Sequence, residues 1–311
     1  MTARELAIVR SVIYAGLFDY PLTVAEVHRT LVGCDASAAD VVATYGRSAL
    51  PREVVEYRDG FFFPAGRGDL IAERRRREAR SRAFLDRHRR LLAMICRLPF
   101  VRMVALSGSI AHLNLEDGGD LDLFIVTRGH HVWTVTLTIL VLTRLLGCRR
   151  EVCANFVVSD SALAFDQPDL FTANQIIHLK PLVGGDVMAR LLRANPFVAR
   201  YYPNAVAELR TENVELRTQD AEGDTRAFRS RFSVLTSQFI ERACRRLYRW
   251  HLRRKSRGWR SPDQVRLGAD CLKLHTRSHR RSITERFDAA VAQALERAEP
   301  PVAVAGHRAR R

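Results

Sequence analysis

The spacing of apolar residues predicts three short helices at the start of the chain. In the first of them Leu6, Val9 and Ile13 fall on one face. Before the second, Thr23 is followed three positions later by Glu26, the pattern of a capping box. The predicted helices cover residues 4–17, 24–31 and 36–45.

Two β-rich runs follow these helices. Residues 53–57 and 61–63 flank Asp59-Gly60, a dipeptide that favours a tight hairpin turn. Three helices followed by a hairpin is the element order of a winged helix. We therefore expect a winged-helix domain over residues 1–66.

The next part of the chain combines a long charged helix with alternating strands and helices. The helix is predicted over residues 68–97 and connects two domains, as a segment of residues 67–98. Residues 99–200 are expected to form an α/β domain, because strand and helix patterns alternate there. Its predicted strands are 101–106, 121–127 and 152–158, and its predicted helices are 110–113, 132–146, 172–179 and 187–192.

The remainder of the chain has helical patterns and polar breaks. Residues 218–225 are polar and predict a linker before a C-terminal helical region of residues 226–298. Helical patterns in that region cover residues 228–254 and 263–298. The tail, residues 299–311, is rich in Pro, Gly and Arg and is expected to be disordered.

Composition is that of a folded protein with an anionic partner or a strong codon bias. Hydrophobic residues make up 47% of the 311 residues, and the formal net charge is +16. Such a charge suits nucleic acid, a nucleotide or an anionic membrane surface. Lysine occurs only at Lys180, Lys255 and Lys273, however, and a GC-rich genome would also produce so much arginine.

Cysteine usage and hydropathy favour a cytoplasmic protein. The six cysteines form no CxxC pair and are expected to be reduced core residues. The N-terminus has no signal-peptide pattern. The most apolar stretch, residues 132–146, is shorter than the roughly 20 residues that a membrane span needs, so a buried helix is expected there.

One stretch carries recognisable chemistry, and it begins with Gly108-Ser109. The apolar strand 101–106 runs into this pair at the predicted start of a helix. Glycine lets a phosphate approach the backbone, and the unpaired N–H groups of a helix start attract negative charge. The Ser109 hydroxyl can donate a further hydrogen bond, so Gly108 and Ser109 are candidate nucleotide-binding residues.

Asp120 and Asp122 follow at the head of the next apolar strand. Side chains on a strand alternate, so both carboxylates project to the same face. Mg²⁺ (or Mn²⁺) bridging these carboxylates and a substrate phosphate would relieve their mutual repulsion. The plainer alternative is that both aspartates are ordinary solvent-facing residues where the loop meets the start of the strand.

Gly-Ser, a spacer of ten residues and Asp-x-Asp on an apolar strand resemble the nucleotidyltransferase superfamily with the DNA polymerase β-like fold. The resemblance implies that Gly108 and Ser109 contact a nucleoside triphosphate and that Asp120 and Asp122 bind the metal. Over roughly residues 8–200 the chain also resembles a group of uncharacterised bacterial nucleotidyltransferases. The matching segments are residues 17–23, 153–156, 171–173 and 180–184, and residues 272–275 would extend them.

The superfamily pattern includes a third carboxylate on a neighbouring strand, and here the chain departs from it. The centre of the predicted strand 151–158 holds Asn155. Glu151 has the same parity but lies at the strand edge, whereas Asp160 lies beyond the other end with opposite parity. An amide can orient a metal but is a poor base. Glu151 and Asn155 therefore both remain candidate catalytic residues.

Three further groups have a chemical and a plainer interpretation. Cys271, His275 and His279 would share one face of a predicted helix and could ligate zinc, although no fourth ligand is evident. His130-His131 could reach a phosphate or lie in a solvated loop. Residues 242–254 mix arginine with Tyr248 and Trp250, which suits nucleic acid or a solvated helix with buried aromatic side chains.

Two functions are carried forward from these patterns. The first is a metal-dependent nucleotidyltransferase that moves a nucleoside monophosphate from a nucleoside triphosphate to an unidentified acceptor and releases pyrophosphate. The second is a catalytically degenerate nucleotide-binding protein that acts as a DNA-binding regulator through its winged helix, with residues 24–31 in the major groove. In that segment Glu26, His28 and Arg29 are the only long polar side chains.

Overall fold

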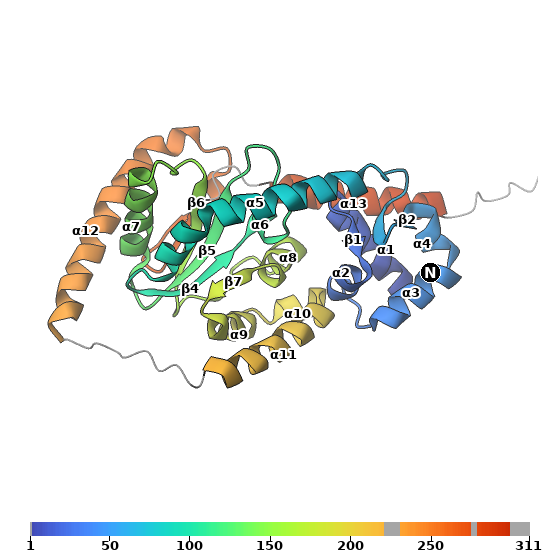
Figure 1. The fold of residues 1–311 in the computed structure, drawn as a ribbon, viewed down its shortest axis with the longest axis horizontal. Helices are drawn as coiled ribbons and strands as arrows, with labels where there is room; N and C mark the ends of the chain where they lie inside the picture. Colours follow the sequence, from blue (N-terminus) through green and yellow to red (C-terminus); the bar gives the residue numbers. More distant parts are fainter. Residues whose placement is uncertain (1, 221–230, 275–278, 299–311) are drawn as a thin grey trace, which may run out of the picture.

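The computed structural model describes residues 2–220, 231–274 and 279–298, which form a mixed α+β fold with two sheets (Figure 1). A three-stranded sheet belongs to the N-terminal part and a six-stranded sheet to the rest. The long helix α5 (Leu70–Cys96) runs between them, as the sequence pattern predicts. Among the described residues no helix combines the length and the apolar character needed to cross a bilayer.

The N-terminal part contains four helices and a small antiparallel sheet of order β1-β3-β2. The three predicted helices and the predicted hairpin are present, and α4 is an addition that the pattern did not predict. The elements are α1 (Ala3–Gly16), β1 (Leu22–Thr23), α2 (Val24–Arg29), α3 (Ala38–Arg47), α4 (Ala49–Val54), β2 (Val55–Arg58) and β3 (Phe61–Pro64).

Local capping sets where these helices begin. The Thr23 hydroxyl accepts from the Glu26 N–H at 3.2 Å, and the Glu26 carboxylate accepts from the Thr23 N–H at 2.8 Å, so the predicted capping box is confirmed. A second box between Ser37 and Asp40 starts α3 at residue 38, two residues later than predicted. The hairpin turns at Asp59 and Gly60, both with positive φ.

The six-stranded sheet has the order β7-β4-β5-β6-β9-β8. Only the β5–β6 pair is parallel, so the sheet is mixed. The three predicted strands of this region are confirmed within one residue. The strands are β4 (Val101–Leu106), β5 (Leu121–Thr127), β6 (Val152–Ser159), β7 (Lys180–Val183), β8 (Val265–Leu267) and β9 (Cys271–Leu274).

Helices cover both faces of this sheet. Successive residues of β4 and β5 point to opposite faces, and both sets of side chains are buried. Met103 and Phe124 pack against α8 to α11, whereas Val104 and Ile125 pack against α5 and α7. The helices that follow β4 along the chain are α6 (Gly108–Ala111), α7 (Val132–Leu145), α8 (Leu170–Ile177), α9 (Gly185–Ala194), α10 (Phe197–Tyr201), α11 (Pro203–Asp220), α12 (Arg231–Lys255) and α13 (Arg280–Ala298).

The prediction of a continuous helical pattern over residues 263–298 is wrong in its first half. Strands β8 and β9 form a hairpin there, and α13 begins only at Arg280. Leu272 is fully buried where β9 pairs with β6, so pairing with an existing sheet outweighs the local helical spacing. Between α12 and β8 lie two 3₁₀ turns, Ser256–Gly258 and Pro262–Gln264.

The two C-terminal helices pack on different parts of the molecule. The Glu241 carboxylate of α12 accepts hydrogen bonds from the backbone N–H groups of Trp133 and Thr134 at 2.9 and 2.8 Å and so caps α7. Helix α13 instead returns to the N-terminal part, where Ile283 and Phe287 join its core (Figure 1). Within the predicted linker, residues 218–220 belong to α11; the remainder, like the predicted tail at 299–311, lies outside the described residues.

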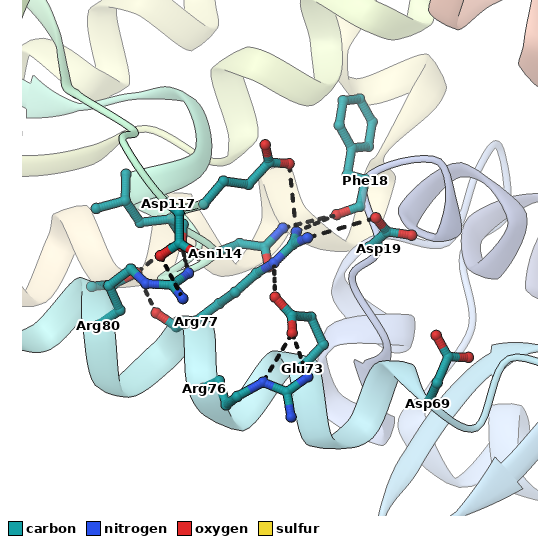
Figure 2. Close-up of polar contacts among 12 residues, drawn as sticks. Phe18, Asp19, Asp69, Glu73, Arg76, Arg77, Arg80, Asn114 and Asp117 are labelled. Carbon is teal, nitrogen blue, oxygen red and sulfur yellow. Dashed lines mark hydrogen bonds and ion pairs between the residues drawn. The ribbon is translucent and has the colours of Figure 1, made fainter.

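A polar network on α5 joins the N-terminal part to the loop that follows α6 (Figure 2). The buried Arg77 guanidinium lies 2.8 Å from Glu73, 3.6 Å from Asp19 and 3.7 Å from Glu116. The Asn114 side-chain amide donates to the Phe18 carbonyl at 2.9 Å. Because these bonds connect residues from three separate segments, they hold the two parts in one orientation.

Candidate metal and nucleotide site

Gly108 and Asp122 are adjacent in the structure, at the end of β4 and the start of β5. The Ser107 N–H donates to the Asp122 carbonyl at 3.0 Å. Gly108 has φ +61°, and a Cβ atom added there would lie 2.4 Å from Oδ2 of Asp122. Only glycine fits this close approach without displacing the carboxylate.

This turn would bind a phosphate through single hydrogen-bond donors and not through a helix dipole. Helix α6 is a single turn of four residues, and Ser107 at its N-cap makes no side-chain capping bond. A helix this short has little dipole, so attraction to an anion would come from the backbone N–H groups at Gly108 and Ser109 and from the Ser109 hydroxyl.

Three side chains gather beside this turn: Asp120, Asp122 and Cys153. One carboxylate oxygen of each aspartate and the Cys153 sulfur all lie within 4.8 Å of one another, and all three side chains are half-buried. Cys153 is present because β5 and β6 run parallel with Asp122 opposite Cys153. The sequence pattern did not identify Cys153 as a site residue, although Cys153 has the same strand parity as Glu151 and Asn155.

The structure places Glu151 in a different environment. Its carboxylate lies 2.7 Å from Nε2 of His88 and 3.0 Å from Arg87, both on α5. Strand β6 begins one residue later, and Glu151 contributes its carbonyl to the Leu121 N–H at 2.7 Å. Glu151 is therefore not part of the cluster of two aspartates and one cysteine. Asn155 lies in β6 near a register shift, but its side chain is outside the described part of the structure.

The donor set fits a small divalent cation held by Asp120 and Asp122. Mg²⁺ prefers oxygen ligands and usually takes only one or two carboxylates, with water and substrate phosphate filling the other positions. The Cys153 sulfur is a poor Mg²⁺ ligand and a better one for a thiophilic cation. The position is accessible because Gly108 is exposed and both aspartates are half-buried.

The same turn also lines a cavity of about 450 Å³. We call it the interdomain cavity, because the N-terminal part, α6, α8 and the start of α13 all line it. Its lining includes Gly108 and Ser109 together with Phe18, Tyr20, His112 and His178. The lining residues come from five segments distant in sequence, within residues 11–30, 108–116 and 171–178, at 202, and within 279–286, so no local pattern predicted the cavity.

Two histidines in the cavity wall are neutral at physiological pH. Burial is the main cause that lowers the pKa of His112 to about 4 and the pKa of His178 well below its ordinary value. Their rings lie 4.0 Å apart, centroid to centroid, and His112 also disfavours charge on His178, which lowers the pKa of His178 further. Nδ1 of His178 bonds the Asn174 carbonyl at 2.8 Å, which makes it the donor and leaves Nε2 as an acceptor.

The polar side chains of α2 are bound within the chain. Glu26 pairs with Arg74 of α5 at 2.8 Å, and His28 and Arg29 lie 3.2 and 3.6 Å from Glu208 of α11. Asn204 of α11 also donates to the His28 carbonyl at 2.7 Å. The surface expected to read a DNA groove is thus engaged by α5 and α11.

The remaining predicted groups are separated from the cluster. Cys271 lies on strand β9, so the helical face on which the zinc interpretation depended is wrong, and His275 lies outside the described residues. His130 pairs with Asp270, and His131 stacks on Phe100 at 3.8 Å. All six cysteines lie within the described residues and are half-buried, and none of them forms a disulfide there.

The arginine-rich helix α12 shows both of the features weighed for it. Tyr248 packs edge-on against Trp133 at 6.2 Å, so this aromatic ring is part of the core. Trp250 is exposed, and the Arg254 guanidinium lies 3.7 Å from its ring centroid.

Comparisons of the chain with family models, with curated proteins and with solved structures found no match.

Proposed function

We infer that this protein is a metal-dependent nucleotidyltransferase that transfers a nucleoside monophosphate from a nucleoside triphosphate to an acceptor and releases pyrophosphate. The observation that carries this proposal is the juxtaposition of the Gly108 turn with Asp122 and of Asp122 with Asp120. A phosphate-binding turn and a pair of carboxylates that face one another are what this reaction needs at one point.

The chain's own residues would divide the work as follows. The backbone at Gly108 and Ser109 and the Ser109 hydroxyl would hold the triphosphate, and Asp120 and Asp122 would hold Mg²⁺ (or Mn²⁺). The bound cation would neutralise phosphate charge and favour deprotonation of the attacking hydroxyl. A winged-helix-like N-terminal part and a polymerase β-like core remain the fold interpretation that accompanies this proposal.

The direct test is release of pyrophosphate by the purified protein from each of the four common ribonucleoside triphosphates. We expect release that requires Mg²⁺ or Mn²⁺ and stops when EDTA removes the cation, because the carboxylates alone cannot stabilise the charge of the phosphates. Release that is equally fast in EDTA would contradict the metal-dependent reaction.

Cys153 favours a second candidate, a nucleotide-binding protein with little or no turnover. Cys153 stands opposite Asp122, where the resemblance leads one to expect a third carboxylate. A cysteine side chain is a poor Mg²⁺ ligand and does not offer the oxygen base that a carboxylate would supply. Under this proposal the protein would bind nucleotide and metal, and DNA regulation would have to use a surface other than α2.

The variant Cys153→Asp separates the two candidates. It places a third carboxylate opposite Asp122, so we expect metal-dependent turnover to rise about tenfold or more, within the range of a positioned base. Cys153→Ser is the matched control, because it keeps the size of the side chain but adds no carboxylate. Equal turnover of the two variants would show that residue 153 is not the missing position.

A further inference from the structure

The interdomain cavity has the size and the wall chemistry of a binding site for a small organic molecule. Its volume of about 450 Å³ lies within the range of about 300–1,000 Å³ typical of such sites. Aromatic rings come from both of its sides: Tyr14, Phe18 and Tyr20 from the N-terminal part, Phe171 and Tyr202 from α8 and the segment after α10.

The polar groups of the wall are mostly uncharged, and several have no hydrogen-bond partner in the described part of the chain. The ring nitrogens of His112 make no hydrogen bond with any described residue, and its ring centroid lies 5.4 Å from that of Tyr20 and 4.0 Å from that of His178. Tyr14 and Asn114 are each 95% buried, and the Tyr14 hydroxyl and Asn114 Oδ1 have no hydrogen-bond partner among the described residues. Unpaired buried polar atoms are costly, so a ligand that satisfied them would gain affinity.

The wall is held in place before any ligand binds. Asn114 Nδ2 donates to the Phe18 carbonyl at 2.9 Å, and Arg77 pairs with Asp19 at 3.6 Å (Figure 2). Asn174 donates to the Tyr202 hydroxyl at 3.1 Å. These bonds fix residues from both sides of the cavity, which lowers the entropic cost of binding.

We propose that the interdomain cavity binds a nucleoside, with the base between the aromatic rings and its polar edge against His112, Tyr14 and Asn114. Neutral donors and acceptors together with aromatic faces are how proteins hold an isolated base. The proposal rests on the proposed function, because the shared Gly108-Ser109 turn would place the nucleoside beside the reacting phosphate. It makes the N-terminal part a substrate-binding element.

The experiment titrates phosphate-free adenosine, guanosine, cytidine and uridine into the full chain by calorimetry without metal. We expect at least one nucleoside to bind. The variant His112→Phe should lower the affinity for that nucleoside about tenfold or more, since phenylalanine keeps a ring but removes both nitrogens. Tyr14→Phe removes one oxygen and little volume, and it should lower the same affinity about threefold or more. This variant provides the test if His112→Phe does not fold. His130→Phe, on the exposed loop after β5, is the matched control and should leave the affinity unchanged.

Two further measurements separate this proposal from the enzymatic one. Mg²⁺-pyrophosphate binding should be the same in His112→Phe and in the unchanged protein, because the phosphate groups would contact the turn. Competition between the nucleoside and a triphosphate would assign the cavity to the donor nucleotide, and simultaneous binding would assign it to a nucleoside acceptor.

The outcomes are distinguishable. If pyrophosphate binds but none of the four nucleosides does, or if His112→Phe and Tyr14→Phe both bind as the unchanged protein does, the cavity proposal is wrong and the enzymatic proposal stands. If a nucleoside binds with the expected sensitivity but no pyrophosphate is released in any condition, the enzymatic proposal fails and the cavity remains a nucleoside site.

Discussion

Replacing Asp122 with asparagine should lower metal-dependent release of pyrophosphate by about 10²–10³-fold, the scale seen when one charge-stabilising group is removed from an active site. The substitution keeps the size of the side chain and removes one of the two charges that would hold the cation. The two carboxylates lie within 4.8 Å of each other, so the variant also loses a repulsion that the metal-free protein contains. Its melting temperature without metal should therefore be unchanged or higher.

A matched control comes from the same loop. Asp117 precedes Asp120 by three residues, and its side chain is 91% exposed and pairs with Arg80 at 2.9 Å (Figure 2). Asp117→Asn removes one charge of the same kind outside the cluster and should leave turnover unchanged. An Asp122→Asn protein that turns over as fast as the Asp117→Asn protein would remove the basis of the enzymatic proposal.

The part of the site that the sequence predicts depends on neighbouring elements with regular periodicity. Strands 101–106 and 121–127 are strongly apolar, and they pair across the connection of residues 107–120, which brings Gly108 next to Asp122. The alternation of side chains along a strand then places Asp120 and Asp122 together. These inferences need no information from the rest of the chain.

Cys153 was not predicted, because its position depends on the register of a parallel pair. Residues 151, 153 and 155 share one parity, and a carboxylate or an amide is the expected metal ligand, which favours Glu151 and Asn155 over Cys153. The register places Val152 opposite Leu121 and Cys153 opposite Asp122, with a shift immediately after this pair. That register is set by packing across the whole sheet, and strand parity alone does not determine it.

Other differences arise where distant segments outweigh a local pattern. Strands β8 and β9 have helical spacing but form a hairpin because β6 offers an edge to pair with. His28 and Arg29 look like exposed polar residues in the sequence, yet Glu208 of α11 binds both. The interdomain cavity is the strongest case, since its residues come from five segments and share no periodicity.

Replacing Gly108 with alanine should lower turnover by about 10²-fold, a loss comparable to that caused by displacing a reacting group by about 1 Å. Two effects act together. An L-residue at φ +61° costs about 1–2 kcal/mol of stability. The new Cβ would also lie 2.4 Å from Asp122 Oδ2 and 3.2 Å from its Cγ, so the carboxylate must move away from its position beside Asp120.

Gly118→Ala separates the contact from the backbone strain. Gly118 has φ +73°, and a Cβ atom added there would meet nothing within 4 Å. Both variants should lose about 1–2 kcal/mol in the free energy of unfolding, measured with urea, because both place alanine in the left-handed region. Only Gly108→Ala should lose turnover and metal affinity, since only its Cβ displaces a carboxylate of the cluster. If the two variants retained the same turnover, the close approach of Gly108 to Asp122 would have no part in the reaction.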